Sequence, residues 1–326
     1  MKALLCREYG PIDRLRVEEV PSPRPGPDQV VVEVKASSLN FPDALLVQGL
    51  YQVKPQLPFS PGMELAGIVK EVGSAVAGLM AGGRVLAFPG GGGFAQECLV
   101  SADRVWPLPP GMDFETGSAF IVTYCTSLHA LKDGGHLQPG ETLLVLGAAG
   151  GVGTAAIEVG KAMGAKVIAA ASSEEKLAFC RTLGADETIN YDEPNLRQRI
   201  LDLTGGRGAD VVYDPVGGAY TEAALRATAW HGRLLVIGFT SGTIPQVKLN
   251  LALLKERSLI GVYWGDWARQ DPEGQRRNVG QLGAWFAEGK IKPAVSERVS
   301  LGEAPAAMMR LLQRKVKGKI VVVPGS

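Results

Sequence analysis

A glycine-rich turn at residues 147–153 constrains the fold of this chain more than any other stretch of its sequence. The run TLLVLG that leads into the turn is short and apolar, as a buried strand is, and the residues that follow it have helical periodicity. Ala148, Gly150 and Gly153 occupy the three positions of a G-x-G-x-x-G pattern, with alanine in the first. A strand, a glycine turn and a helix in this order predict a dinucleotide-binding unit.

Each glycine of the turn has a physical role in such a unit. Gly150 allows the backbone to approach a pyrophosphate, and Gly153 allows the helix to lie close to the strand. The free N–H groups at the start of the helix then face the phosphates. We therefore predict that the turn binds the cofactor through Ala149, Gly150, Gly151, Val152 and Gly153.

The second strand of this unit ends without the acidic residue that usually holds the adenosine ribose. Ala171 takes that position and is followed by Ser172, Ser173 and, further on, Lys176. A carboxylate there would repel a 2′-phosphate, whereas hydroxyls and an ammonium group would bind it, so the sequence favours NADP(H) over NAD(H). The alternative is that Ser172 caps the next helix and Lys176 is solvated. Tyr191, at the end of the following strand, is expected beside the adenine.

The pattern of predicted secondary structure changes near Thr116. Before it, short apolar runs rich in Val, Gly and Pro predict a compact β-rich domain. After it, helical stretches alternate with buried strands, which is typical of a doubly wound parallel sheet. Two further helices and a final strand, KIVVVP, follow Trp264, and we expect that strand to pair with the N-terminal domain.

Composition excludes several classes of partner. Lys and Arg number 34 against 33 Asp and Glu, so no strong field favours nucleic acid or an anionic membrane. No apolar run is long enough to span a bilayer, and the N-terminus lacks a signal-peptide core. The 4 cysteines are widely spaced, without a CxxC pair, as is typical of reduced thiols in a cytoplasmic protein.

Five stretches of the sequence together carry a resemblance to a known family. They are SSLNFPDALLVQGLY (37–51), LPFSPGMELAGIVKEVG (57–73), GAAGGVG (147–153), INYDE (189–193) and KGKIVVV (317–323). On these motifs the chain resembles the medium-chain dehydrogenase/reductase superfamily, specifically its zinc-free, zeta-crystallin-like quinone oxidoreductase branch. The resemblance extends over essentially the whole length.

The resemblance implies an α/β fold of two domains. A Rossmann domain that binds NADP(H), residues 120–263, is expected as an insertion in a β-rich GroES-like catalytic domain, residues 1–119 and 264–326. It also implies a homodimer joined through an edge strand of the cofactor sheet, and a small electrophilic molecule as substrate.

The residues that hold zinc in other members of the superfamily are missing. Their GHE motif reads GME here, with Met63 at the histidine position, and SSLNF contains no cysteine. Of the four cysteines of their structural zinc lobe, only Cys98 has a counterpart. Met is a poor ligand for Zn²⁺, and Glu64 alone cannot supply three ligands, so we expect no metal.

Without a metal, the chemistry expected is transfer of a hydride from NADPH to a quinone or to an alkene conjugated with a carbonyl group. By resemblance, Tyr51 and Asn40 face the nicotinamide, with Tyr51 as hydrogen-bond donor and Asn40 as a positioning group. The alternative for Tyr51 is that it only lines the site with its ring, with its hydroxyl in water. The alternative for Arg314 is that it lies on a solvated basic face. Further nicotinamide or phosphate contacts are expected at Thr126, Gly238, Phe239, Val262, Tyr263 and Arg314.

Two other functions compete with this one. An enoyl thioester reductase needs a basic track for the phosphates of CoA, and Lys54 is the only Lys or Arg between residues 36 and 69. A non-catalytic NADPH-binding protein would not need Asn40 and Tyr51, which are both present. Single-stranded RNA is disfavoured because no basic, aromatic platform is evident.

Overall fold

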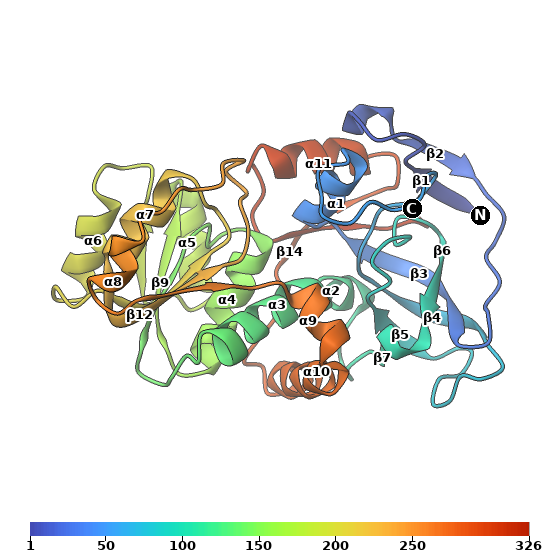
Figure 1. The fold of residues 1–326 in the computed structure, drawn as a ribbon. Coiled ribbons are helices and arrows are strands. Elements are labelled where there is room, and N and C mark those ends of the chain that lie inside the picture. The colour runs from blue at the N-terminus through green and yellow to red at the C-terminus, as the bar shows by residue number, and fades with distance from the viewer. Residues whose placement is uncertain (326) are drawn as a thin grey trace. The chain divides into compact units, whose positions relative to one another are not determined.

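The computed structural model describes residues 1–325, which form two compact units (Figure 1). The first unit contains Met1–Val122 and the C-terminal segment that begins at Pro293. The second unit contains Thr123–Lys292. The chain therefore begins the first unit, builds the second, and returns to the first.

The first unit is built on a seven-stranded sheet of order β14-β15-β3-β4-β5-β7, with β6 also paired to β3. Only β14 and β15 pair in parallel. The closing strand β15 pairs with β3, as predicted. A separate antiparallel pair is formed by β1 (Lys2–Leu5) and β2 (Arg16–Glu19). The strands of the sheet are β3 (Gln29–Ser38), β4 (Leu65–Val72), β5 (Arg84–Ala87), β6 (Glu97–Ser101), β7 (Val105–Pro107), β14 (Val295–Val299) and β15 (Lys319–Val322).

Helix α1 (Phe41–Val47) of the first unit begins directly after β3. A capping box between Asn40 and Asp43 and a proline in the first turn define its start, and Gly49, with φ +69°, follows its end. Its buried Ala44 packs in one apolar cluster with residues of α11. The other helical segments are η1 (Ile12–Arg14), η2 (Ala102–Arg104), α2 (Phe114–Ser118) and α11 (Ala304–Leu312).

The second unit contains a six-stranded parallel sheet of order β10-β9-β8-β11-β12-β13, which confirms the predicted doubly wound fold. The strand order reverses between β8 and β11, and ligands of such sheets bind at this point, beyond the carboxyl ends of the strands. The strands are β8 (Thr142–Val145), β9 (Lys166–Ala171), β10 (Glu187–Asn190), β11 (Ala209–Asp214), β12 (Thr228–Val236) and β13 (Ser258–Gly261).

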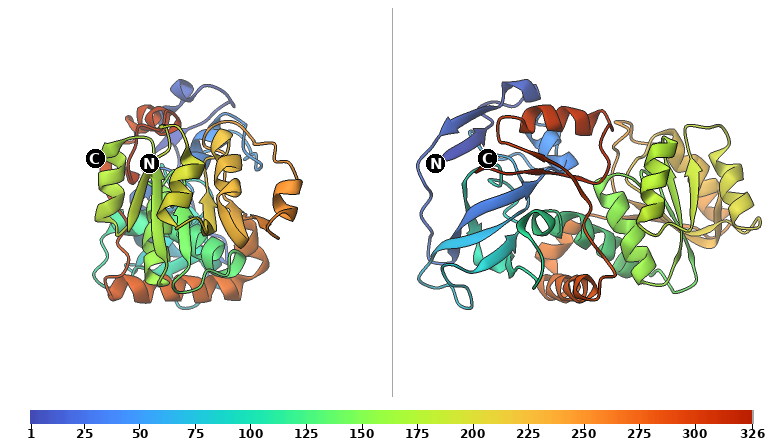
Figure 2. Two further views of the ribbon diagram at one scale, coloured as in Figure 1. Left: turned by 90° about the vertical axis from the view of Figure 1, so that its left-hand side faces the viewer. Right: turned by 180° about the vertical axis from the view of Figure 1, so that it is seen from behind.

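Helices cover both faces of this parallel sheet (Figure 2). The segment before β8 is continuous helix with two π-helical stretches. Among residues 1–325, no helix combines the length and apolarity that crossing a bilayer requires. The helical segments are η3 (Ile121–Cys125), α3 (Thr126–Leu128), η4 (His129–Gly134), α4 (Gly151–Ala162), α5 (Glu174–Thr182), α6 (Leu196–Leu203), α7 (Ala219–Arg226), α8 (Asn250–Leu253), α9 (Trp264–Gln270) and α10 (Pro272–Ala287).

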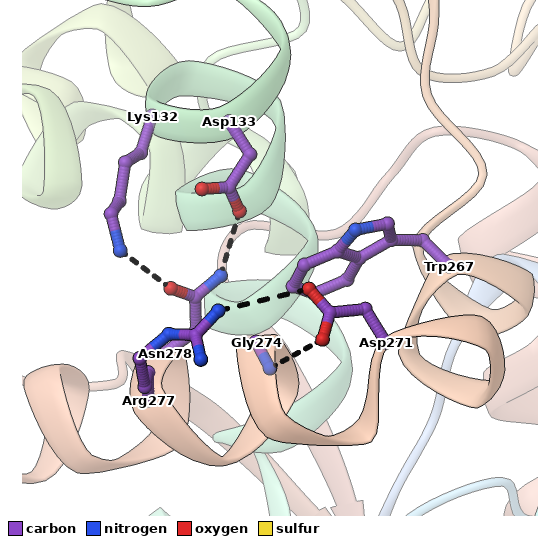
Figure 3. A pocket seen from close by; sticks show the side chains of 7 residues that line it. All are labelled: Lys132, Asp133, Trp267, Asp271, Gly274, Arg277 and Asn278. Atoms are coloured by element: carbon purple, nitrogen blue, oxygen red, sulfur yellow. Dashed lines mark hydrogen bonds and ion pairs between the residues drawn. The ribbon is translucent and has the colours of Figure 1, made fainter.

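Helices α9 and α10 group with the second unit, whereas the sequence-based division placed residues 264–292 with the catalytic domain. The buried amide of Asn278 on α10 explains this grouping (Figure 3). It accepts a 2.9 Å hydrogen bond from Lys132 Nζ and donates a 2.9 Å hydrogen bond to Asp133 Oδ2, both on η4. The small polar pocket around these groups is lined by side chains that already bond one another, and it contains none of the predicted site residues.

Candidate active site

The carboxyl ends of the six parallel strands bring most of the predicted cofactor residues to one edge of the second unit's sheet. Parallel strands end on the same side, so segments far apart in sequence meet there. The glycine turn follows β8, the serines follow β9, and Tyr191 follows β10. The predicted nicotinamide residues follow β12 and β13.

The glycine turn has the geometry that a pyrophosphate site requires. A Cβ on Gly153 would lie 2.4 Å from the Gly147 carbonyl oxygen and 2.7 Å from the Ala148 Cα, so only glycine fits there. A Cβ on Gly150, the N-cap of α4, would meet just the Gly147 oxygen, at 3.4 Å. Gly153 therefore serves helix packing, while the space over Gly150 is left for a ligand that approaches the N–H groups at the start of α4.

A serine hydroxyl and a lysine ammonium group are in contact after β9, near the position where an acidic residue would usually hold the ribose. Lys176 Nζ donates a 2.9 Å hydrogen bond to Ser172 Oγ. Ser173 caps α5 by accepting a 3.4 Å hydrogen bond from Lys176 N, so the cap is Ser173 and not Ser172, which was the alternative weighed above. The buried Ala171 contributes no charge. Glu174, at the start of α5, is paired with Arg181.

Tyr191 lies next to this cluster. Its backbone N–H donates a 3.1 Å hydrogen bond to the Ala171 carbonyl, so the ends of β9 and β10 are tied together. Its ring packs against Tyr220, with centroids 4.5 Å apart and planes tilted by 42°. Tyr191 is 8% exposed.

The predicted nicotinamide residues of the second unit are mostly partly buried. Gly238 and Phe239 follow β12, and Gly238 N lies 3.4 Å from the Asp214 carbonyl oxygen. Val262 N donates to the Val236 carbonyl at 3.0 Å, and Tyr263 is 49% exposed. Thr126, at the start of α3, is partly buried.

Sequence reasoning missed a carboxylate at this edge. Asp214 ends β11 and is buried, and its Oδ1 accepts 2.9 Å hydrogen bonds from the backbone N–H groups of Val216 and Gly217. Its Oδ2 accepts a 2.6 Å hydrogen bond from Thr221 Oγ1. The carboxylate is used entirely to shape the β11–α7 turn. An Asp-Pro-Val-Gly-Gly stretch after a strand is the signal that could have indicated it.

In the first unit, Asn40 belongs to a buried polar network that the sequence did not reveal. Asn40 Nδ2 donates to Glu64 Oε1 at 2.9 Å, and Asn40 Oδ1 accepts from Lys319 Nζ at 2.6 Å. Lys319 Nζ also lies 3.2 Å from Glu64 Oε1. Ser38 Oγ and Val122 N donate to the same carboxylate at 2.6 and 2.8 Å. Glu64 therefore accepts from four donors of its own unit, and its carboxylate is fully used within that unit.

The electrostatics of this network follow from its burial. Loss of solvation lowers the pKa of Lys319, and the charge of Glu64 opposes that shift. Loss of solvation also raises the pKa of the fully buried Asp43 to about 7, against the opposing effect of hydrogen bonds from the N–H groups of Asn40 and Gly62. Because its pKa is raised, ionisation of Asp43 destabilises the folded unit as pH rises from about 4 to 7.

Tyr51 and Arg314 are the other predicted site residues of the first unit. Tyr51 is partly buried in the segment after α1. Arg314 is exposed just beyond α11, where its φ is +57°. Among residues 1–325, no group of three or more His, Cys, Asp or Glu side chains is placed to hold a metal ion.

Two protein families match this chain. Residues 26–110 match the alcohol dehydrogenase GroES-like domain. Residues 151–276 match a family described as zinc-binding dehydrogenase. A GroES-like domain combined with a parallel dinucleotide-binding sheet defines the medium-chain dehydrogenases/reductases, a class of oxidoreductases.

Full-length relatives give the branch within this class. A quinone oxidoreductase-like protein 2 homolog from Nematostella vectensis is 39% identical over 328 residues, which cover 98% of this chain and 88% of the relative. The structure of Escherichia coli quinone oxidoreductase complexed with NADPH superposes with a TM-score of 0.93 at 30% identity, and 99% and 100% of the two chains are covered. That of the CurK enoyl reductase has a TM-score of 0.89 at 27% identity, with 99% and 98% covered. The chain belongs to the quinone oxidoreductase family of the medium-chain dehydrogenases/reductases.

Proposed function

We propose that this chain is an NADPH-dependent reductase that transfers a hydride to a quinone or to an alkene conjugated with a carbonyl group, without a metal. The observation that carries the proposal is the edge of the parallel sheet, where an open glycine turn lies beside a Ser172–Lys176 cluster in place of an acid. NADP(H) is the cofactor that fits this edge. The quinone oxidoreductase relatives, one of them complexed with NADPH, support the same conclusion.

Each site residue then has a separate task. The N–H groups of residues 149–153 bind the pyrophosphate, and Ser172, Ser173 and Lys176 bind the 2′-phosphate. Tyr191 packs beside the adenine. NADPH supplies the hydride when it is bound. The remaining residues, Thr126, Gly238, Phe239, Val262 and Tyr263, hold the nicotinamide, and Arg314 adds a phosphate contact.

Tyr51 supplies the hydrogen bond that the reaction needs. Hydride transfer to an enone or a quinone places negative charge on the substrate's oxygen, and a phenol hydroxyl can donate to that oxygen. A positioned donor of this kind stabilises the charge only as it develops.

Substrate class is tested by following the oxidation of NADPH with quinones, enones, nitroalkenes and enoyl-CoA thioesters in parallel. We expect turnover with quinones or enones, and weaker turnover with thioesters because the first unit offers little positive charge between residues 36 and 69. Preference for an enoyl-CoA would establish the alternative function, an enoyl thioester reductase, which the likeness to CurK favours. Binding of NADPH without turnover of any acceptor would establish a non-catalytic NADPH-binding protein.

Replacing Tyr51 with phenylalanine should lower kcat by about 2- to 13-fold and change KM for the acceptor little. The reason is that one neutral hydrogen bond contributes roughly 0.5–1.5 kcal/mol. Steady-state kinetics at saturating NADPH measure the effect, with the unfolding midpoint as a check that the variant is folded. A fall of about 10⁴-fold would instead make Tyr51 an obligate proton donor, since that exceeds one hydrogen bond.

Activity should survive dialysis against a chelator, and elemental analysis should find far less than one zinc per chain. The physical reason is that Glu64 is committed to donors of its own unit, while Met63 occupies the position of the missing histidine. A zinc-dependent alcohol dehydrogenase treated in parallel serves as the positive control. Stoichiometric zinc whose removal abolishes activity would contradict the metal-free mechanism.

We also propose that the chain forms a homodimer through the exposed edge strand β13. This strand pairs only with β12 among the described residues, and apolar side chains nearby in sequence are exposed, including Leu253 (77%), Leu254 (62%) and Leu259 (39%). Light scattering at micromolar concentration should give twice the 34.4 kDa chain mass. Leu254→Glu and Leu259→Glu together should produce a monomer, and a wild-type monomer would contradict this proposal.

We place the protein in the cytoplasm because its cysteines are buried thiols, which suit a reducing compartment.

A further inference from the structure

A buried serine of the second unit bonds to the first turn of α4. Ser127 lies in α3, the short α-helical turn between the π-helical stretches η3 and η4, and α3 packs against α4 (Figure 1). Ser127 is fully buried, and its Oγ donates a 3.1 Å hydrogen bond to the carbonyl oxygen of Val152. A serine hydroxyl has one hydrogen, so its capacity to donate is used.

This bond fixes the direction in which the neighbouring Tyr213 hydroxyl donates. Tyr213 Oη lies 3.1 Å from Ser127 Oγ, and either hydroxyl could donate across that contact. A carbonyl oxygen can only accept, so the Ser127 hydrogen goes to Val152 and Tyr213 donates to Ser127. Tyr213 is fully buried in β11, where burial raises the pKa of its hydroxyl and keeps it protonated. One directed chain of hydrogen bonds therefore joins β11, α3 and α4.

The Val152 oxygen differs from the two carbonyl oxygens before it. Gly150 O accepts from Thr154 N at 2.8 Å and Gly151 O accepts from Thr154 Oγ1 at 2.8 Å, so both bonds stay within the turn. The α-helix offers the Val152 oxygen an N–H group one turn further on. Ser127 supplies a second donor to this oxygen, and that donor comes from another helix.

A second donor on the Val152 oxygen acts on the N–H group of Gly153. The two belong to one peptide group, which is planar and trans, so the N–H points away from the carbonyl oxygen and towards the start of the helix. Because Gly150 is the N-cap of α4, the Gly153 N–H is among those without a partner inside the helix. Donation to the oxygen restrains the peptide plane and polarises the group, so that its N–H donates more strongly.

We propose that Ser127 and Tyr213 are positioning residues that orient and polarise the Val152–Gly153 peptide group for the pyrophosphate of the cofactor. The inference rests on the proposed function, because it takes the glycine turn to bind NADPH. All of these residues belong to the second unit, so the arrangement is complete within that unit. It gives two hydroxyls that have no exposed surface a task in cofactor binding.

The inference is tested by comparing NADPH with adenosine 2′-monophosphate, which carries the 2′-phosphate and lacks the pyrophosphate. Ser127→Ala should raise the dissociation constant of NADPH by about 2- to 13-fold, up to the contribution of one neutral hydrogen bond. The constant for adenosine 2′-monophosphate, measured by competition, should not change, because we assign that ligand to Ser172 and Lys176. A general loosening of the second unit would weaken both ligands, so the ratio of the two constants reports the pyrophosphate site.

The directed chain is tested with Tyr213→Phe, alone and combined with Ser127→Ala. Alone, it should weaken NADPH by a smaller factor than Ser127→Ala, because Ser127 keeps its own hydrogen but loses the donor that directs it. In the Ser127→Ala background it should change NADPH affinity no further, since Tyr213 acts only through Ser127.

Thr228→Val is the matched control. It also removes a buried hydroxyl that donates to a carbonyl oxygen, in this case that of Leu225 at 2.8 Å. Thr228 begins β12, so it lies at the end of the strand opposite the cofactor edge. The variant should keep the wild-type dissociation constants of both ligands.

Three results would overturn the inference. The first is a Ser127→Ala variant that binds NADPH as the wild type does, and the second is one that weakens both ligands by the same factor. The third is a Tyr213→Phe substitution that has no effect alone, or the same effect with and without Ser127. If Ser127→Ala does not fold, Tyr213→Phe decides, and an unchanged ratio there counts against the inference. Failure of the wild type to bind NADPH would contradict the proposed function instead.

Discussion

Gly153→Ala should destabilise the second unit and weaken cofactor binding together. The added Cβ would lie 2.4 Å from the Gly147 oxygen and 2.7 Å from the Ala148 Cα, and backbone atoms cannot move aside as a flexible side chain can. Helix α4 must then shift away from β8. Overpacking of this kind costs roughly 1–3 kcal/mol. The shift also moves the N–H groups that we assign to the pyrophosphate.

Gly150→Ala is the matched variant that separates binding from folding. Its Cβ would be in ordinary contact at 3.4 Å, and its φ of −80° suits alanine. The variant should therefore unfold like the wild type. It should nevertheless bind NADPH roughly 5- to 150-fold more weakly, if the methyl group overpacks the pyrophosphate by a similar 1–3 kcal/mol.

Thermal unfolding and NADPH titration of both variants measure these effects. Gly280→Ala is the control for the substitution itself, since a Cβ there meets nothing within 4 Å on α10, and it should leave both unchanged or raise stability slightly. If Gly150→Ala bound NADPH as tightly as the wild type, the pyrophosphate would not lie over this turn.

The glycine turn and the parallel sheet could be predicted because their signals are local. Gly147, Gly150 and Gly153 lie within one turn, and each buried strand is a short apolar run of its own. The Ser172–Lys176 contact was likewise accessible, since its partners are only four residues apart at the start of α5.

The network around Asn40 could not be found in this way. Lys319 and Glu64 are 255 residues apart, and in the sequence alone each of these charged residues predicts a solvated side chain. Only the pairing of β15 with β3 brings Lys319 to Asn40. The grouping of α10 with the second unit could not be predicted for a related reason. Its contacts with η4 depend on Asn278, a polar residue with no apolar pattern to indicate its burial.

Lys176→Ala should raise the dissociation constant of NADPH by about 10- to 150-fold and leave that of NADH nearly unchanged. The lysine ammonium lies beside Ser172 where a 2′-phosphate would bind, and a hydrogen bond to a charged group contributes roughly 1.5–3 kcal/mol. NADH lacks that phosphate, so it loses nothing comparable. Added salt should weaken NADPH binding more than NADH binding for the same reason.

Two companion variants make this test specific. Lys161→Ala removes the same charge at the far end of α4, about 15 Å along the helix from its N-terminus, and should leave both cofactors unaffected. Ala171→Asp should shift preference towards NADH, because a carboxylate at the end of β9 accepts from the ribose hydroxyl and repels a phosphate. Fluorescence titration of both cofactors into wild type and variants measures each constant. Two results would show that the 2′-phosphate does not bind in this pocket: a wild type that prefers NADH, or a Lys176→Ala variant that binds both cofactors more weakly by the same factor. The absence of the acidic residue would then need another explanation.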